Sequence, residues 1–504
     1  MKDQWLNFRP LCLIFAFLLL GTIFSFYVAS NTLITVLVSI LVLSVLIFIC
    51  IKNKSAKFII ISALAFAVGA GAYFMATLQF APKETALPSV VEARIYNVGV
   101  PQDGTLTLYA DSIKFDENKQ NFNLIIRLYD TTNDFSAFEI GDILSLNPSK
   151  IYATDLFFYK TPNAKYYADN LKYSIIVSAG DVNEIGHDKT FAEQIRLKIK
   201  ENLHNGLSNE NVEIAYSALF GDKTMLSPDQ YNAYKMSGIA HMLAVSGLHV
   251  GIIVGLLSKL FKLLKVKPKI SFIIICLMLI FYMYVCNFAV SVVRATIMSV
   301  LLLLAPIVKR RYDSLSALGI AGIICFAINP LLAFDVSALM SFSCIAGIVL
   351  LYKSISLALA KVKFPNALAK SLALSASTSI AMLVIMAFFF NNLNIISLIA
   401  NIILIPIFTV AFSITFVLAL FSLVLPFITY LLYPIGFVYD FLNLVAVVLG
   451  NLPIANFSTI SFNYIAIVVY FLFLLLISRI CTASETNKVV YTLPLLAIFF
   501  VCLL

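Results

Sequence analysis

Five ionisable side chains fall inside or at the edges of long apolar stretches of the 504-residue chain. A charged group within a lipid bilayer costs about 3 kcal/mol or more, so residues of this kind are functional candidates. Together they can line a polar cavity that opens on one side of a membrane. The five are His241, His249, Arg294, Asp335 and Asp440, and the polar residues that accompany them are Ser246, Ser291, Ser341 and Asn443.

The densest local pattern is segment 236–251, which reads MSGIAHMLAVSGLHVG and follows a Gly221-Asp222 pair. Small residues in such a segment allow another helix or an extended ligand to approach closely. If the segment were one helix, His241 and His249 would share a face but stand about 12 Å apart along its axis, too far apart to bind one metal ion. The small residues are Gly238, Ala240, Ala244, Gly247 and Gly251.

Two interpretations stay open for the polar residues of these stretches. Ser246 and His249 are three residues apart, a spacing that allows a Ser/His nucleophile pair. Because no third, orienting acid lies nearby in the sequence, lining of a pore or packing is the main interpretation and hydrolase chemistry is the alternative. Arg294 either lines the polar cavity or forms a salt bridge to Asp335 or Asp440 that only fixes helix packing.

The composition excludes an ordinary soluble protein, because 61% of the residues are hydrophobic and 12% are charged, against about 45–50% and about 25% in soluble domains. The net charge of +9 is unevenly distributed. Segment 81–235 has 15 basic and 21 acidic residues, which leaves 20 basic and 5 acidic residues elsewhere. None of the eight cysteines lies in that polar segment, and their spacing predicts neither a disulfide framework nor a zinc site. We expect no metal and no cofactor.

The apolar runs predict a polytopic α-helical membrane protein with about thirteen transmembrane spans of about 20 residues each. Basic residues of the short loops gather at 52–57, 259–269, 309–311 and 353–370, all on one face of this threading, which indicates the cytoplasmic side. Three retained spans from an inside amino terminus then place the polar segment outside the cytoplasm. The spans are 10–29, 32–51, 58–80, 237–258, 270–287, 289–308, 315–334, 335–352, 371–391, 395–423, 427–449, 458–478 and 489–504.

The chain therefore divides into three amino-terminal spans (1–80), an outer β domain (81–188), a linking helical segment (189–236) and a second membrane part (237–504). The outer segment alternates apolar and polar residues between turn signals, which predicts short strands and a small β-barrel of the OB type. Within the linking segment Phe191, Ile195, Ile199 and Leu203 form one apolar stripe. This helix either lies on the membrane surface or caps the β domain.

Several of these motifs resemble those of the ComEC family, the inner-membrane DNA channels of natural transformation. The likeness is strongest in GDKTMLSPDQYNAYKMSGIAHMLAVSGLHVGII at 221–253, and it continues through 291–336 and through SLIANIILIPI at 397–407. The outer β segment, with FEIGD at 138–142, resembles the family's OB domain more loosely. The resemblance implies that 237–504 is a competence-type channel domain that conducts single-stranded DNA across the cytoplasmic membrane.

Two departures from the family pattern matter. The family's GFqLSF element reads SALMSF at 337–342, so the role of its glutamine cannot be transferred to this chain. No HxHxDH metal motif occurs in the sequence, so we expect a form that lacks the carboxy-terminal metallo-β-lactamase-like domain. This polypeptide is then not an enzyme and has no catalytic residues, and a separate nuclease degrades the second strand.

A channel of this kind must carry a polyanion across about 30 Å of hydrocarbon. It therefore needs a hydrated path with hydrogen-bond donors for phosphate. The alternatives are an intramembrane hydrolase that uses Ser246 and His249, and a transporter of another polymer or metabolite. The residues expected along the path are His241, Ser246, Gly247, His249, Gly251, Arg294, Asp335, Ser341, Asp440 and Asn443.

The net negative charge of the outer domain does not favour DNA binding by charge alone. A local basic strip within it can still contact DNA, and its candidate residues are Arg94, Lys114, Arg127 and Lys172. Otherwise the domain docks a periplasmic or surface DNA-receptor protein, or shapes the entrance. The expected partners are single-stranded DNA, that receptor, a cytoplasmic motor or single-strand-binding proteins, the separate nuclease and the lipid bilayer.

Overall fold

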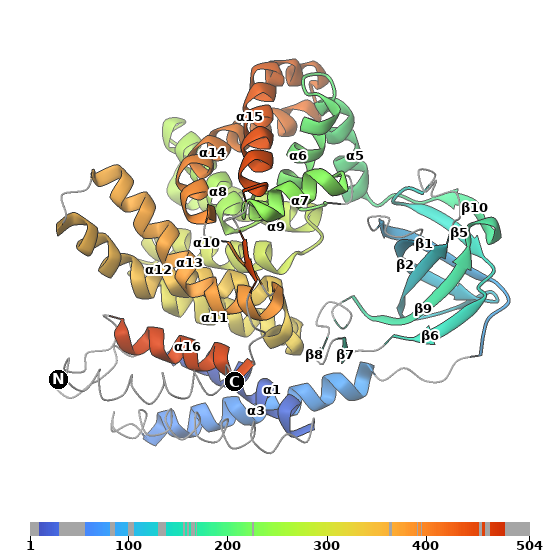
Figure 1. Ribbon diagram of the computed structural model, residues 1–504, viewed down its shortest axis with the longest axis horizontal. Coiled ribbons are helices and arrows are strands. Elements are labelled where there is room, and N and C mark those ends of the chain that lie inside the picture. The colour runs from blue at the N-terminus through green and yellow to red at the C-terminus, as the bar shows by residue number, and fades with distance from the viewer. Residues whose placement is uncertain are drawn as a thin grey trace.

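The computed structural model separates a β domain from a larger helical body, with the β domain at the right of Figure 1. Helices α1, α3 and α16 lie together along the lower edge of the helical body, and α14 and α15 stand at its upper end. The structure describes residues 10–29, 56–80, 86–98, 105–129, 138–154, 157–158, 161–162, 167, 169–223, 226–361, 365–390, 392–394, 396–452, 456–458 and 464–478.

The helices match the predicted apolar spans closely at most positions. α1 and α3 are the first and third predicted spans, while the predicted spans 32–51 and 489–504 lie outside the described residues. The α-helices are α1 (Pro10–Ala29), α3 (Ala56–Phe80), α5 (Phe191–Leu203), α6 (Asn209–Phe220), α7 (Pro228–Met236), α8 (Gly247–Leu263), α9 (Pro268–Val285), α10 (Val290–Ile307), α11 (Ser314–Ile328), α12 (Val336–Lys361), α13 (Asn366–Phe390), α14 (Ile396–Ser422), α15 (Tyr433–Gly450) and α16 (Tyr464–Ile477).

Within the described residues, seven helical segments are long and apolar enough to cross a membrane. They fall on α3, α9, α10, α12, α13, α14 and the run from Pro426 to Gly450. The chain therefore has the helices of a membrane protein, and the count of about thirteen spans stays a prediction. α14 continues through Pro406 as a single helix, which neighbouring helices allow in a membrane bundle.

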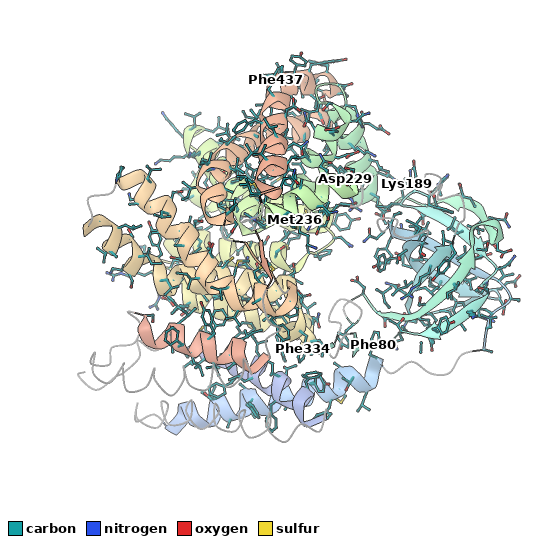
Figure 2. The ribbon with its side chains drawn as sticks, viewed as in Figure 1. Phe80, Lys189, Asp229, Met236, Phe334 and Phe437 are labelled. Atoms are coloured by element: carbon teal, nitrogen blue, oxygen red, sulfur yellow. The ribbon has the colours of Figure 1, made fainter. Side chains whose placement is uncertain are left out.

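Two predicted spans are not continuous helices. Span 315–334 breaks at Asn329, where α11 ends and a 3₁₀ helix, η3 (Pro330–Phe334), follows. Span 237–258 breaks between α7 and α8. α7 ends at Met236, and Gly238 adopts a left-handed backbone (φ +76°) that stops the helix. A short 3₁₀ helix, η2 (Ala240–Leu243), follows, and the chain is extended at Ala244 and Ser246 before α8 begins at Gly247. Asp229 and Met236 mark the run of α7 through the middle of the helical body (Figure 2).

The β domain is one curled sheet in the order β10-β5-β1-β2-β4-β9-β6, with β3 paired to β2. β5 is the second strand from one end of this order and β6 is the last strand at the other end, although only residues 147–149 separate them in the chain. The backbone ladder does not close in the described part of the domain, so the OB-like barrel is not confirmed. The strands are β1 (Val91–Val98), β2 (Thr105–Phe115), β3 (Asn118–Lys119), β4 (Asn123–Tyr129), β5 (Asp142–Leu146), β6 (Lys150–Ala153), β9 (Leu171–Ser178) and β10 (Val182–His187).

Side chains alternate along these strands in part as the sequence pattern predicts, although Ile125 of β4 is buried between two buried neighbours. In β4, Leu124, Ile126 and Leu128 are buried, while Arg127 and Tyr129 are exposed. Pairs β1–β2 and β2–β4 are antiparallel, and β4–β9 is parallel. The buried face of these strands forms a core separate from the helical cores, so the outer segment is a structural unit of its own.

An ion-pair network joins the β domain to α5. Arg94 on β1 donates to both Asp111 carboxylate oxygens (2.9 and 2.8 Å), to Glu193 (3.1 Å) and to the backbone carbonyl of Asp188 (3.0 Å). Glu193 also completes the capping box of α5 by accepting from the backbone N–H of Thr190 (2.7 Å). Lys189 stands at this junction in Figure 2.

The far end of α5 packs on the helical body. Asn202 donates to the backbone carbonyl of Ser422 at the end of α14 (3.0 Å), and Thr429 donates to the carbonyl of Asn202 (2.6 Å). Phe191, at the start of the helix, is 62% exposed. The linking helix therefore bridges the β domain and the bundle instead of only capping the sheet.

Candidate functional site

The candidate site lies at the start of α8, where the chain becomes helical again after an extended segment. Ser246 is the N-cap of α8, and its hydroxyl accepts from the backbone N–H of Leu248 (3.3 Å). The Ser291 hydroxyl of α10 donates to the Val245 carbonyl (2.7 Å) and ties the extended segment to that helix. The N-terminus of a 17-residue helix is thereby placed inside the helical body.

His249 completes this cap and explains the three-residue spacing. Its Nδ1 accepts from the backbone N–H of Ser246 (3.1 Å) and lies 3.0 Å from the Ser246 hydroxyl oxygen. An Nδ1 that accepts a backbone hydrogen bond carries no proton, which leaves the Nε2–H tautomer for the neutral ring. Nε2 makes no hydrogen bond with any described residue, and the ring packs edge-on against Phe408 and Phe412 at centroid distances of 5.5 and 4.5 Å.

The same geometry bears on the hydrolase alternative. A nucleophilic serine needs a base with a free lone pair and a third group that orients that base. Here the Nδ1 lone pair of His249 already accepts from the Ser246 backbone, and Nε2 has no hydrogen bond to a described carboxylate that would orient the ring. The Ser246–His249 contact therefore has the arrangement of a helix cap.

Arg294 reaches this helix end from α10. Its side chain is buried, with 3% of the residue exposed, and its Nη2 lies 3.2 Å from the position that a Cβ atom would take on Gly247. Its neighbours include the Met298 sulfur, 3.9 Å from Nη1, and the Phe342 ring, 5.7 Å from the guanidinium carbon, and the Cys325 and Cys344 thiols lie within electrostatic range. Nε has no hydrogen-bond partner among the residues that the structure describes.

The predicted salt bridge of Arg294 is not found in the described part of the chain. None of the ion pairs there includes Arg294. Asp335 instead caps α12, where it accepts from the Ala338 backbone N–H (2.7 Å), and Asp440 accepts from Asn211 of α6 (2.8 Å). The guanidinium charge is therefore balanced by no described carboxylate at contact distance.

A helix N-terminus and a buried guanidinium are both positive poles, and here they converge on Gly247. A helix N-terminus carries about half a positive charge, although Ser246 already accepts from the Leu248 N–H at the start of α8. An arginine adds donors suited to phosphate oxygens. Such an arrangement favours an anion with hydrogen-bond acceptors, and phosphate is the most common anion of that kind.

The structure brings together four of the ten residues predicted for the path, namely Ser246, Gly247, His249 and Arg294. Ser341 precedes Phe342, whose ring lies against the guanidinium. The other predicted residues lie elsewhere or face solvent. His241 is exposed on η2 and Gly251 on α8, Asp335 caps α12, and on α15 Asp440 is exposed while the Asn443 side-chain oxygen is buried without a hydrogen bond to any described group.

The sequence reasoning missed Phe342, Met298, Phe408 and Phe412 as neighbours of the site. The i, i+4 repeat of Phe408, Phe412 and Phe416 on one face of α14 was a signal that aromatic rings line one surface. Asn211, which holds Asp440, was also missed, because nothing local in the sequence pairs α6 with α15.

In the β domain the four predicted DNA contacts differ in their surroundings. Arg94 is 9% exposed and is bound by its two carboxylates, and Lys114 pairs with Glu92 (2.7 Å). Burial alone would lower the pKa of Arg94, but hydrogen bonding to Asp111 and the charges of Asp111 and Glu193 raise it above its ordinary value. Arg127 is exposed on β4, and Lys172 is half-buried on β9.

One group in the described residues has metal-ligand types, and it lies in the β domain. Ligand atoms of Asp142, Glu184 and His187 lie within 4.8 Å of one another. His187 already contacts Asp142 through Nδ1 and Glu184 through Nε2, each at 2.7 Å. The imidazole therefore joins two carboxylates across β5 and β10, and these contacts suffice to explain the cluster.

Two known proteins resemble part of this chain. ComE operon protein 3 of Bacillus subtilis (strain 168) is 28% identical over 207 residues, which cover 40% of this chain and 25% of that protein. Recombination protein 2 of Haemophilus influenzae (strain ATCC 51907 / DSM 11121 / KW20 / Rd) is 26% identical over 162 residues, 31% of this chain and 20% of that protein. The matched part thus spans a quarter or less of these relatives. No solved structure matches this chain.

A family profile described as Competence protein matches residues 218–482, which is more than half of the chain. The matched segment begins near the end of α6 and includes Ser246, Gly247, His249 and Arg294. The chain therefore belongs to the competence protein family.

Proposed function

We propose that this protein takes part in DNA uptake during transformation, as a channel that conducts single-stranded DNA across the cytoplasmic membrane. The observation that carries the proposal is the buried Arg294, which no described carboxylate neutralises and which stands at the N-terminus of α8. Membership of the competence protein family supports the same function.

A single buried cation suits the transport of a DNA strand better than a pore lined with many basic residues. A strand that binds strongly to many cations gains affinity with each phosphate contact and is released slowly. One guanidinium beside a helix terminus can offset the desolvation of one phosphate group at a time as the strand advances. An inside-negative membrane potential opposes the inward movement of phosphate, so the proposal includes a cytoplasmic motor or single-strand-binding partner.

The outer surface of the sheet supports contact between the β domain and DNA. Lys150 on β6 and Arg127 on β4 both pair with Ile176 of β9, so they lie on one face about 10 Å apart. Tyr152, 48% exposed, follows Lys150 on the same face of β6. Cations interleaved with exposed aromatic rings are the usual platform for single strands. Docking of a DNA-receptor protein on this face is the competing proposal for the outer domain.

The proposed placement is the inner membrane, with the β domain outside the cytoplasm. The basic loop at 52–57 supports it, because one candidate membrane span, α3, separates this loop from the β domain. A separate nuclease for the second strand and the absence of enzymatic activity in this polypeptide belong to the same proposal.

Deletion of the protein tests the proposed function directly. We expect that cells without it still bind labelled double-stranded DNA at the surface but bring no labelled strand into the cytoplasm, because only the conduit is lost. The measurement is the nuclease-protected label in wild-type and deleted cells. Normal protected label in the deleted strain would contradict the proposal.

Ser246→Ala distinguishes the hydrolase alternative from the channel. Loss of a nucleophile would abolish the activity of a hydrolase, whereas loss of an N-cap costs about 1 kcal/mol of stability and leaves a channel able to conduct DNA.

Gly247→Ala is expected to lower DNA uptake about fivefold or more. The added methyl group would stand 3.2 Å from Arg294 Nη2, so the guanidinium must shift within a buried site, and a shift that costs about 1 kcal/mol gives an effect of this size. Gly251→Ala on the same helix is the matched control, because nothing lies within 4 Å of its Cβ position. Equal uptake by the two variants, at equal abundance in the membrane, would show that the space beside Arg294 does not matter.

A further inference from the structure

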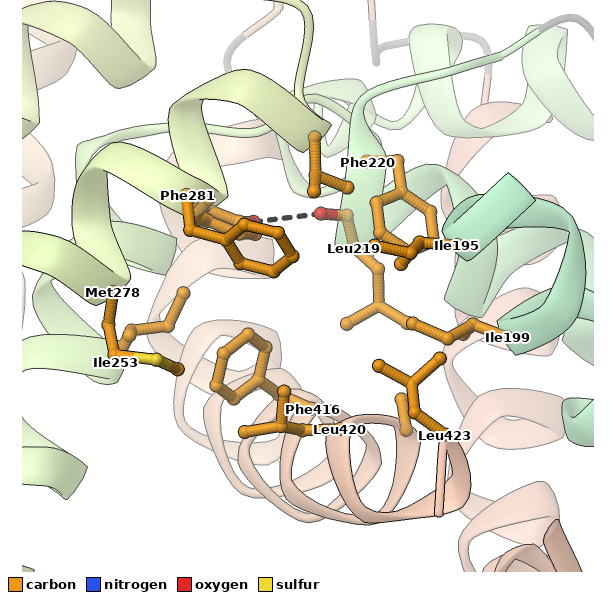
Figure 3. Close-up of a pocket in the computed structure, with 13 residues that line it drawn as sticks. Ile195, Ile199, Leu219, Phe220, Ile253, Met278, Phe281, Phe416, Leu420 and Leu423 are labelled. Carbon is orange, nitrogen blue, oxygen red and sulfur yellow. Dashed lines mark hydrogen bonds between the residues drawn. The ribbon is translucent and has the colours of Figure 1, made fainter. Parts of the chain in front are cut away.

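A second feature of the helical body is a pocket between α5, α6, α8, α9 and α14 (Figure 3). It encloses about 40 Å³ and is partly open. Ile195 and Ile199 enter it from α5, and Phe416 and Leu420 enter it from α14. Two of the lining helices, α9 and α14, carry candidate membrane spans.

The walls of this pocket offer no free hydrogen-bond partner to a water molecule. Every lining side chain is apolar except Tyr282, whose hydroxyl already donates to the Leu219 carbonyl (2.8 Å; dashed in Figure 3). A buried water needs two to four polar partners and about 10–15 Å³ of space. The pocket has room for about three groups of that size but lacks the partners, so methylene groups fill it better than water.

A cation stands beside the apolar walls. Arg196 follows Ile195 on α5 and lies within electrostatic range of Cys286, next to the lining residue Val285. Its Nε is buried without a hydrogen bond to any described residue, and no described ion pair includes its guanidinium. Glu193, one turn earlier, is already bound by Arg94. The charge beside the pocket is therefore open to an anion.

Exposed apolar side chains lie on the helices around the pocket. Phe421 and Val424, at the end of α14, are 54% and 79% exposed, and Phe191 on α5 is 62% exposed. Exposed apolar side chains next to candidate membrane spans are normal only where acyl chains cover them. The ligand that best matches an apolar pocket with a neighbouring cation in this setting is a membrane lipid.

We propose that the pocket holds the methylene groups nearest the glycerol in an acyl chain of an anionic phospholipid whose phosphate is bound by Arg196. The apolar walls select the chain and the guanidinium selects the headgroup charge. The bound lipid fills space between α5 and the bundle, and so it braces the helix that joins the β domain to the membrane helices.

The test uses the full chain in vesicles of phosphatidylcholine with increasing phosphatidylglycerol, with bromine on the acyl chains of one lipid at a time. Trp5 is the only tryptophan in the sequence, so Trp5→Phe with Phe416→Trp places one reporter in the pocket. We expect brominated phosphatidylglycerol to quench this reporter more than brominated phosphatidylcholine does. Leu277→Trp, at a residue 61% exposed on α9, is the control reporter for surrounding lipid and should respond equally to both.

Arg196→Gln in the reporter background is expected to raise the half-saturating phosphatidylglycerol fraction about fivefold, which corresponds to about 1 kcal/mol. Lys198→Gln removes the same charge from an exposed position of α5 and should change it less than twofold. Equal quenching by the two lipids, no quenching, or equal effects of the two glutamine variants would overturn the proposal. If Phe416→Trp does not fold, Leu420→Trp reports on the same pocket.

Discussion

Arg294→Glu is expected to reduce DNA uptake about a hundredfold or more, whereas Arg294→Gln reduces it about tenfold. Each tenfold step corresponds to about 1.4 kcal/mol. Glutamine removes the charge but keeps a hydrogen-bond donor near the N-terminus of α8. Glutamate removes the donor and adds a negative charge that repels each phosphate, in a site where only 3% of the residue is exposed. The measurement is the nuclease-protected DNA label per cell.

Arg310→Glu is the matched control, because it makes the same charge reversal at an exposed residue beyond the end of α10. We expect it to leave uptake within about twofold of wild type, a difference below about 0.5 kcal/mol. Membrane abundance of all three variants must be equal for the comparison. If Arg294→Glu imports DNA as well as Arg310→Glu does, then Arg294 does not lie on the path of the strand.

Arg94→Met is expected to destabilise the junction between the β domain and α5 by about 3–5 kcal/mol. The arginine makes four hydrogen bonds there, to Asp111, Asp188 and Glu193. Its loss leaves the Glu193 carboxylate, of which 6% of the side chain is exposed, without its positive partner. The measurement is hydrogen exchange of the backbone amides in β1 and the first turn of α5 in the purified full chain.

Two further variants show whether Arg94→Met acts through the lost charge pairing or through lost packing. Lys114→Met breaks an exposed pair with Glu92, and such pairs contribute about 0–1 kcal/mol, so exchange should change little. Arg94→Met combined with Glu193→Gln should recover much of the protection, since no buried charge then remains unpaired. Exchange in Arg94→Met that equals exchange in Lys114→Met would show that the network does not hold the junction.

Helix positions were largely predictable from the sequence. The first predicted span coincides with α1 at both ends, and 270–287 and 289–308 lie within two residues of α9 and α10. These boundaries depend on local features, namely runs of apolar residues and the turn residues between them. The alternation of buried and exposed residues in β4 is local in the same sense. The segment around Ser246 could be singled out as a candidate site because charged and small residues stand out in an apolar chain.

The break before α8 was not predictable by hydropathy, because Gly238 to Ser246 is as apolar as a continuous span. The break depends on which backbone groups find partners, such as the Val245 carbonyl that accepts from Ser291 of another helix. The partners of Asp440 and Arg94, and the residues Gly247 and Phe342 beside Arg294, likewise come from distant parts of the chain.

The sequence by itself determined that this chain is a membrane protein with a polar β segment, that its costly polar groups gather near residues 241–251 and 294, and that its motifs are those of the competence family. Only the tertiary structure decided that His249 serves as a helix cap, that Arg294 stands against Gly247, and that Arg94 is a link between domains. The reason is physical: hydrophobic runs and periodicity are local properties, whereas the partner of a buried charge depends on the folding of segments about a hundred residues apart, as with Arg94 and Glu193.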